Sequence, residues 1–253
     1  MQALLPDWCR LVRADNPGPM TLDGTNTYVV RTDAGNVVID PGPLLEPHLA
    51  AVAALGPVVL IVLTHHHDDH GGGAGRFHEL TGAPVVGRDP ALCTGGWRLP
   101  CDGGVLDVPG LPIRVIDSPG HTADSVSLSA GDGTDRLLFS GDTVLGRGTT
   151  VVSHPDGDLG SYLATLERLR SAAGEGCLLL PGHGPVREDA VAVITQYLAH
   201  RAQRIEQVRA ALALGAQTAR EVTEIVYADV DPSMWGAADR TVEATLEYLR
   251  SGD

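Results

Sequence analysis

A group of metal-binding side chains follows a short apolar segment near residue 60. Residues 60–73 read LIVLTHHHDDHGGG. Four side chains in this stretch can each offer a lone pair to a metal ion, and they form the pattern H-x-H-x-D-H: His65, His67, Asp69 and His70. Imidazole nitrogen and carboxylate oxygen are donors that borderline metals such as zinc accept readily. Four such donors within six residues predict a metal site rather than an ordinary polar loop.

Three further donors each follow a predicted strand and lie beside glycine. They are His121 in SPGHT, Asp142 in SGDT and His183 in PGHGP. Taken singly, each could equally well be a turn residue and not a metal ligand. Because functional groups of layered α/β proteins converge at the carboxyl ends of strands, we expect all seven donors to form one site.

Seven donors are enough for two metal ions. A three-histidine set leaves one position open, as in catalytic zinc sites: His65, His67 and His121. A second ion can use Asp69, His70 and His183, and the two oxygens of Asp142 can bridge the pair. A hydroxide held between two cations has a lowered pKa and is a nucleophile at neutral pH. We therefore expect two Zn²⁺ ions per chain, with Asp69 as the catalytic residue that orients the hydroxide.

Strands and helices are mixed up to about residue 185, and only helices are predicted after it. Expected strands lie at 10–13, 25–32, 36–40, 57–64, 84–87, 111–117, 125–130, 136–140 and 177–180, and expected helices at 45–55, from 68 or 69 towards 80, and at 159–172. The apolar strand at 57–64 suits a position covered on both faces. Later helices are expected at 191–214, 219–227 and 237–250. We therefore predict a catalytic domain at 1–186 and a helical domain at 187–253.

Composition limits the class of partner. The formal net charge of −14 gives no electrostatic footprint for sequence-independent binding of nucleic acid. The four cysteines are widely spaced and are expected to be buried free thiols. Neither a signal peptide nor a membrane-spanning segment is evident, so a cytoplasmic protein without membrane contact is expected.

The motifs, in this order, resemble the metallo-β-lactamase superfamily. The resemblance covers residues 10–185 and implies an α/β (α+β) fold, a four-layer αβ/βα sandwich, with hydrolytic activity. Asp40 in VVIDPG matches the early aspartate of the superfamily, which supports the ligands from behind them. Asp142 argues against true β-lactamases, which typically lack that carboxylate.

Longer stretches resemble one subfamily, the lactamase-beta-two-like proteins. These stretches are NPGPMTLDGTNTYVV, SGDTVLGRGTTVV, LPGHGP and AHRAQR. Studied animal members are endoribonucleases, so the resemblance implies hydrolysis of phosphodiesters in single-stranded RNA. It also implies a small winged-helix-like domain at the C-terminus, which we expect to be truncated before its β wing. The last predicted helix carries Asp239, Glu243 and Glu247, so it is not a basic recognition helix and no DNA recognition is expected.

Two other functions remain open. The same centre can hydrolyse a thioester, a lactone or another acyl ester of a small-molecule substrate, as in hydroxyacylglutathione hydrolases. Their Tyr/Lys-rich glutathione site is not found in this sequence. A non-catalytic metal-binding scaffold is the alternative of another class, and the complete set of seven ligands opposes it.

Substrate contacts are expected from residues near the metal motifs. Asn26 in GTNTY is placed at the mouth of the site, although a turn residue explains it equally well. Arg147 follows Asp142 by five residues and is the best contact for an anionic substrate, with an ordinary surface Arg as the alternative. Arg201 and Arg204 share one helix face, which is either solvated or in contact with phosphate. The apolar stripe of the late helices packs on the catalytic domain or forms a homodimer.

Overall fold

Two β-sheets face each other at the centre of the molecule. The computed structural model describes residues 5–131 and 135–252. The first sheet has the order β1-β2-β3-β4-β5, formed by Cys9–Arg13, Asn26–Thr32, Gly35–Ile39, Val58–Val62 and Val85–Val86. The second has the order β6-β7-β8-β9, formed by Ile113–Asp117, Val126–Ala130, Leu137–Gly141 and Leu178–Pro181. The pairs β3–β4, β4–β5 and β8–β9 are parallel.

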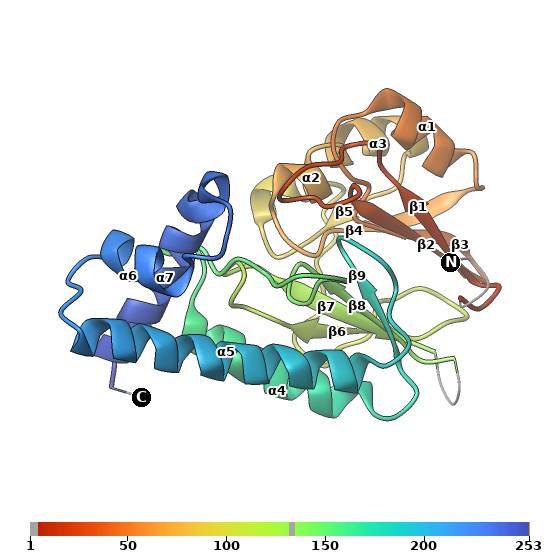
Figure 1. The fold of residues 1–253 in the computed structure, drawn as a ribbon. Helices are drawn as coiled ribbons and strands as arrows, with labels where there is room; N and C mark the ends of the chain where they lie inside the picture. Colours follow the sequence, from red (N-terminus) through yellow and green to blue (C-terminus); the bar gives the residue numbers. More distant parts are fainter. Residues whose placement is uncertain (1–4, 132–134, 253) are drawn as a thin grey trace.

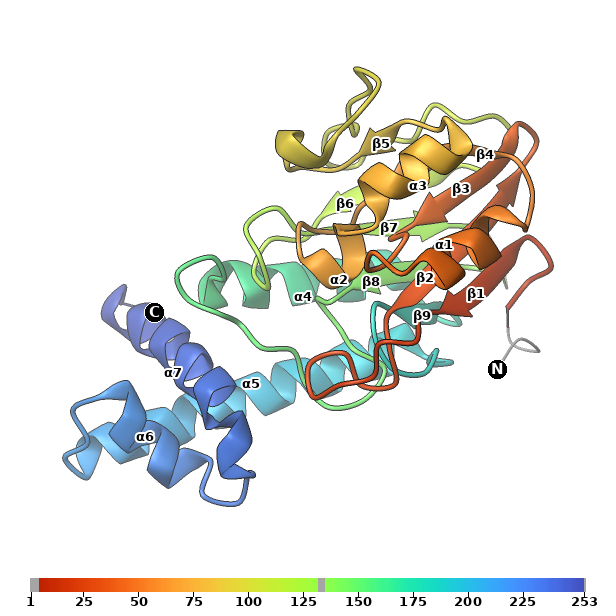
Figure 2. The ribbon, with the colours of Figure 1, turned by 90° about the horizontal axis from the view of Figure 1, so that it is seen from above.

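Helices cover the outer face of each sheet (Figure 1). The first sheet is covered by α1 (Glu46–Ala53) and α3 (Ala74–Thr81), and the second by α4 (Leu159–Ala173) and α5 (Ala190–Ala213). The short α2 (Asp68–Gly71) lies at the end of the first sheet. Asp158 and Asp189 begin the two long helices by accepting hydrogen bonds from the backbone N–H groups of Ser161 and Ala192. The result is the predicted four-layer αβ/βα sandwich, which Figure 2 shows from above.

The alternation of apolar side chains along the strands produces these layers. In β3, Val37 and Ile39 point between the sheets while Val38 points towards the helices. In β8, Phe139 lies between the sheets and Leu138 faces α4 and α5. Because successive strand residues point to opposite faces, strands that are apolar throughout must be covered on both sides. The burial of β4 between both neighbouring layers agrees with its prediction as a central strand.

The helix expected from residue 68 or 69 towards residue 80 is divided in two. The α2 helix ends at its C-cap, Gly72, and α3 starts again after Gly73. A Cβ atom at Gly73 would lie 2.9 Å from the carbonyl oxygens of Gly42 and Pro43. Gly73 thus lets the segment approach a neighbouring turn closely, which the local sequence did not reveal.

The last helices pack on one another and on α5. The α6 helix (Ala219–Val226), a 3₁₀ turn (Pro232–Met234) and α7 (Trp235–Arg250) follow. The first half of α5 packs on the second sheet through Val193, Ile194 and Tyr197. Its end packs through Val208 and Ala211 against α6 and α7. The predicted division at 186/187 stays a prediction, because α5 belongs to both cores, and no strand follows β9 among the described residues up to 252.

Two further expectations from the sequence concern the cysteines and membrane-spanning helices. Cys9 and Cys177 are buried free thiols as expected, but Cys93 is only half-buried and Cys101 is exposed, because both lie in the irregular segment at 89–104. Among the described helices, none is both long and apolar enough to cross a membrane. The cytoplasmic location stays a prediction.

Candidate metal centre

The seven predicted ligands come together at one edge of the two sheets. They follow four strands: His65, His67, Asp69 and His70 come after β4, His121 after β6, Asp142 after β8 and His183 after β9. Their donor atoms fall into three overlapping sets, each within 4.8 Å: His65, His67 and His121; His65, His70 and Asp142; and Asp69, His70 and His183. The first and third sets are those that the sequence predicted.

The distances between donor atoms match the edges of a coordination polyhedron. Nδ1 of His67 lies 3.0 Å from Nε2 of His65 and 3.3 Å from Nε2 of His121. In the other set, Nε2 of His183 lies 3.0 Å from Oδ2 of Asp69 and 3.2 Å from Nε2 of His70. Four donors around zinc, each 2.0–2.1 Å from it, are separated by about 3.3 Å. The residues therefore fit two metal ions of this size.

Asp142 lies between the two sets. Its Oδ1 is 3.4 Å from Nε2 of His70, and its Oδ2 is 3.3 Å from Nε2 of His183 and 3.9 Å from Nε2 of His121. Oδ1 is buried and accepts no hydrogen bond from the described residues. A Cβ atom at position 182 would lie 2.4 Å from this oxygen, so only Gly182 leaves it room. This placement suits a carboxylate that bridges two cations.

The hydrogen bonds of the imidazoles direct their lone pairs inward. Nδ1 of His70 donates to Asp40, Nδ1 of His121 donates to the carbonyl of Val151 at 2.8 Å, and Nδ1 of His183 donates to the carbonyl of Gly24 at 3.3 Å. With Nδ1 protonated, Nε2 of each neutral ring is the metal-binding atom. Backbone carbonyls leave no mark in the sequence, so the roles of Val151 and Gly24 were not predictable from it.

The carboxylates of the cluster favour positive charge on two of its histidines, His70 and His183. Burial lowers the pKa of His70, but the carboxylates of Asp142 and Asp40 outweigh burial and raise it well above its usual value. For His183, burial is likewise outweighed by Asp142, and the pKa rises to about 9. Burial and the neighbouring imidazoles hold the pKa of His65 well below its usual value. Without metal, the carboxylates favour protonation of His70 and His183. A metal ion that binds these two rings must therefore displace their protons.

Asp40 forms hydrogen bonds to Thr64 and His70 behind the cluster, and its role in supporting the ligands stays a prediction. Its Oδ1 accepts from the backbone N–H of Thr64 at 2.7 Å. Its Oδ2 accepts from Thr64 Oγ1 at 2.7 Å and from His70 Nδ1 at 2.8 Å. Asp40 is buried and has a φ of 50°, an uncommon conformation that Asp and Asn tolerate better than other residues. Thr64 is a further supporting residue, and its position directly before the first motif was the available signal.

Replacing Asp40 with Asn is expected to weaken metal binding about 10–100-fold. Asn keeps the size and tolerates the backbone angle, but one amide N–H₂ group must then face the donors on Thr64 or His70. Competition with a chromogenic chelator measures the affinity, and circular dichroism checks the fold. Asp107→Asn, a matched change away from the cluster, should leave the affinity unchanged. An unaltered affinity in Asp40→Asn would contradict the supporting role.

Asn26 does not lie at the mouth of the site, which corrects its prediction. Its side chain is buried, and Nδ2 donates to the carbonyls of Pro181 and Gly184, both at 2.9 Å. It therefore holds the two sides of the loop that carries His183. The partners are more than 150 positions away in the chain, so local sequence could not reveal this role.

Arg147 lies beside the metal centre. A pocket of about 210 Å³ is lined by Arg147 together with His121 and Asp142. The guanidinium donates to both carboxylate oxygens of Asp23, at 2.6 and 2.9 Å. Substrate contact by Arg147 stays a prediction. The rest of this pocket, which we call the metal pocket, is largely apolar, with walls from Met20, Leu22, Leu145 and Met234.

Comparisons with known proteins agree with this geometry. Residues 20–183 match the family model of the metallo-beta-lactamase superfamily, and residues 218–252 match that of the beta-lactamase associated winged helix domain. A beta-lactamase-like protein 2 homolog from Caenorhabditis elegans is 33% identical, over 97% of this chain and 85% of that protein. An atrochrysone carboxyl ACP thioesterase from Aspergillus fumigatus is 34% identical, over 86% of this chain and 73% of that protein.

A solved structure shares the fold over nearly the whole length. A metallo-beta-lactamase family protein from Thermus thermophilus superposes with a TM-score of 0.80 at 21% identity, covering 97% of this chain and 94% of that one. With the sandwich, the ligand cluster and the family match in agreement, the chain belongs to the metallo-beta-lactamase superfamily and is a hydrolase of that superfamily.

Proposed function

We propose that this hydrolase cleaves acyl thioesters or related acyl esters with two zinc ions held by the seven-ligand cluster. The observation that carries the proposal is the metal pocket. His121 and Asp142 line a small space whose other walls are mostly aliphatic or thioether side chains. Such walls suit an acyl chain, because burial of apolar surface is favourable and the few polar groups fix orientation.

The residues of the cluster have distinct tasks in such a reaction. When bound, a metal pair lowers the pKa of water and polarises a carbonyl oxygen. Asp142 lies between the two ligand sets and holds them together. Asp69 is more exposed than Asp142, at 28% against 11% of the side chain. Because its Oδ2 lies next to His70 and His183, Oδ1 is the oxygen that can accept a proton from an attacking water.

Comparison with the Aspergillus thioesterase supports the acyl substrate. That relative acts on an acyl carrier protein thioester by its name and covers most of this chain. The net charge of −14 also disfavours a long polyanionic substrate.

Hydrolysis of single-stranded RNA is the second candidate. The resemblance of the motifs to the endoribonuclease subfamily favours it, and so does the winged-helix match at residues 218–252. The exposed positions of α7 oppose it, because Glu243 and Glu247 offset Arg240 and Arg250, so that helix does not present the basic surface of a recognition helix.

A side-by-side substrate panel tests the two candidates. Protein loaded with zinc should hydrolyse S-acyl pantetheine thioesters and leave an unstructured RNA intact, with two zinc ions per chain by elemental analysis. Cleavage of the RNA without thioester hydrolysis would replace the proposal with the second candidate. Hydrolysis of neither substrate, together with fewer than two metals, would favour the non-catalytic scaffold. Light scattering of the same sample tests the predicted homodimer.

A further inference from the structure

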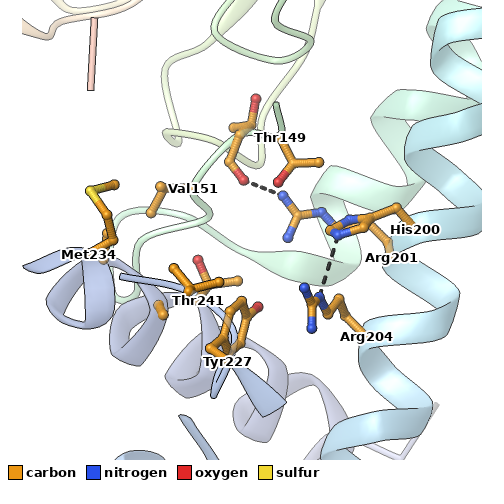
Figure 3. Close-up of a pocket in the computed structure, with 12 residues that line it drawn as sticks. Thr149, Val151, His200, Arg201, Arg204, Tyr227, Met234 and Thr241 are labelled. Carbon is orange, nitrogen blue, oxygen red and sulfur yellow. Dashed lines mark hydrogen bonds between the residues drawn. The ribbon is translucent and has the colours of Figure 1, made fainter. Parts of the chain in front are cut away.

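A second pocket adjoins the metal pocket on the side of the C-terminal helices. Its volume is about 190 Å³, and it lies between α5, the segment at 149–151 and the C-terminal segment that carries α6 and α7 (Figure 3). We call it the arginine pocket, after the two α5 side chains that line it, Arg201 and Arg204. The opposite wall includes Tyr227, Met234 and Thr241. None of the described residues that line it is acidic.

Arg201 brings a buried positive charge to this pocket. Its side chain is 3% exposed and donates through Nη2 to the carbonyl of Thr150. The guanidinium carbon lies 5.1 Å from the centre of the Tyr162 ring. Nε is buried and has no hydrogen-bond partner among the described residues. An unpaired buried donor on a charged group is strongly unfavourable, so an acceptor beside it, from a bound ligand or an ordered water, is expected.

Arg204 adds a second guanidinium one turn along the helix. It stacks on the Tyr227 ring at 4.5 Å and donates to the carbonyl of Val226 at 2.8 Å. Within residues 5–131 and 135–252, neither Arg204 nor Arg201 forms an ion pair with a carboxylate. Carbonyls and aromatic rings hold both groups in place without neutralising them.

His200 supplies another unpaired donor. Nε of Arg204 donates to Nε2 of His200 at 3.4 Å, so Nε2 is the acceptor and the proton of the neutral ring is on Nδ1. Nδ1 is buried and has no partner in the described part of the chain. Burial, Arg201 and Arg204 together lower the pKa of His200 to about 4, so the ring is neutral at pH 7.

We propose that the arginine pocket binds a phosphate group of the substrate. Phosphate oxygens accept from guanidinium and imidazole N–H groups, and Arg is the residue best suited to bind them in a bidentate manner. The role of this site in substrate binding depends on the proposed hydrolysis of acyl thioesters. It narrows the substrate to an acyl thioester of a phosphate-bearing carrier arm.

The two pockets are suited to two parts of one substrate. Each is smaller than the 300–1,000 Å³ typical of ligand sites. They share four lining residues, which form a common wall: Thr149, Thr150, Val151 and Met234. An acyl group in the metal pocket and a phosphate in the arginine pocket would therefore lie on opposite sides of these four residues.

The common wall also links the phosphate site to the metal ligands. Thr150 accepts from Arg201 through its carbonyl and donates through Oγ1 to the carbonyl of Asp142 at 2.6 Å. The carbonyl of Val151, the next residue, accepts from His121. A phosphate bound by the arginines is thereby held at a fixed place relative to the reacting centre, which is how remote binding assists a reaction.

A pair of substrates that differ only in the phosphate tests this role. We expect the wild type to hydrolyse S-acyl 4′-phosphopantetheine with a kcat/KM at least about 10-fold above that of S-acyl pantetheine, mainly through KM. Arg204→Gln should bring this ratio near one, and Arg204→Lys should retain part of it. Arg209→Gln removes an exposed charge from the same helix, where Arg209 pairs with Glu206, and should keep the full ratio. A wild type without preference, or a full preference in Arg204→Gln, would overturn the proposal.

Titration with inorganic phosphate separates this site from the hydrolytic function. Phosphate should raise the Tm of the metal-loaded wild type and of Arg209→Gln, and raise it less in Arg204→Gln. If thioesters are not hydrolysed but the phosphate effect depends on Arg204, the acyl function fails and the phosphate site stands. If thioesters are hydrolysed without preference for the phosphorylated substrate, and phosphate raises the Tm of Arg204→Gln as much as that of the wild type, the phosphate site is wrong and the acyl function stands. RNA cleavage that weakens in Arg204→Gln would overturn the carrier-arm assignment.

Discussion

Replacing Asp142 with Asn is expected to lower hydrolysis on the order of 10³-fold and to reduce the metal content from two ions to about one per chain. The loss exceeds the 10–100-fold typical of residues that only support ligands, because Asp142 contacts both sets. Asn offers one weakly basic oxygen in place of two charged ones. It also leaves His70 and His183 without the carboxylate that stabilises positive charge beside them.

Elemental analysis and kinetics on the same sample test the bridging role. Asp68→Asn is the matched control, because Asp68 lies in the same motif, is exposed and belongs to none of the ligand sets. It should keep both metals and full activity. If Asp142→Asn also keeps two metals and full activity, the bridge between the two sets does not exist.

The metal ligands were predictable because their chemistry is local. Each lies in the segment that follows an apolar strand, and strand ends of a layered fold meet at one edge. Element types were predictable for the same reason, since the period of apolar residues determines the layers. The break at Gly73 was not predictable, because the turn at Gly42 and Pro43, far away in the chain, requires the close approach.

The roles of residues that depend on tertiary contacts were harder to predict from the sequence. An Asn near a glycine suits a loop at the substrate, but the amide of Asn26 binds carbonyls of the β9 loop instead. The spacing of Arg201 and Arg204 indicates only that they share one helix face. In the folded protein, Arg201 packs on Tyr162 of the sandwich, whereas Arg204 packs on Tyr227 of the C-terminal helices. The sequence does not indicate that this helix face lies between the two parts.

Replacing Asp69 with Asn is expected to lower kcat about 10²–10³-fold while a larger share of the metal is retained than in Asp142→Asn. Asp69 contacts only one ligand set, through Oδ2, at 3.0 Å from His183 Nε2 and 3.4 Å from His70 Nε2. An Asn oxygen can keep part of that contact. The amide cannot accept a proton from water, so the chemical step is impaired more than substrate binding and KM changes little.

The pattern of losses distinguishes the two tasks of Asp69. Burial raises the pKa of Asp69, but His183 and His70 outweigh it and hold the pKa below its usual value, so the carboxylate is ionised at neutral pH. A residue that only binds metal would lose activity in proportion to the lost ion, and excess zinc would restore it. A residue that also moves a proton leaves kcat low at full occupancy. Full recovery of kcat in excess zinc would therefore reduce Asp69 to a ligand, and persistent loss would establish it as the group that positions the attacking water.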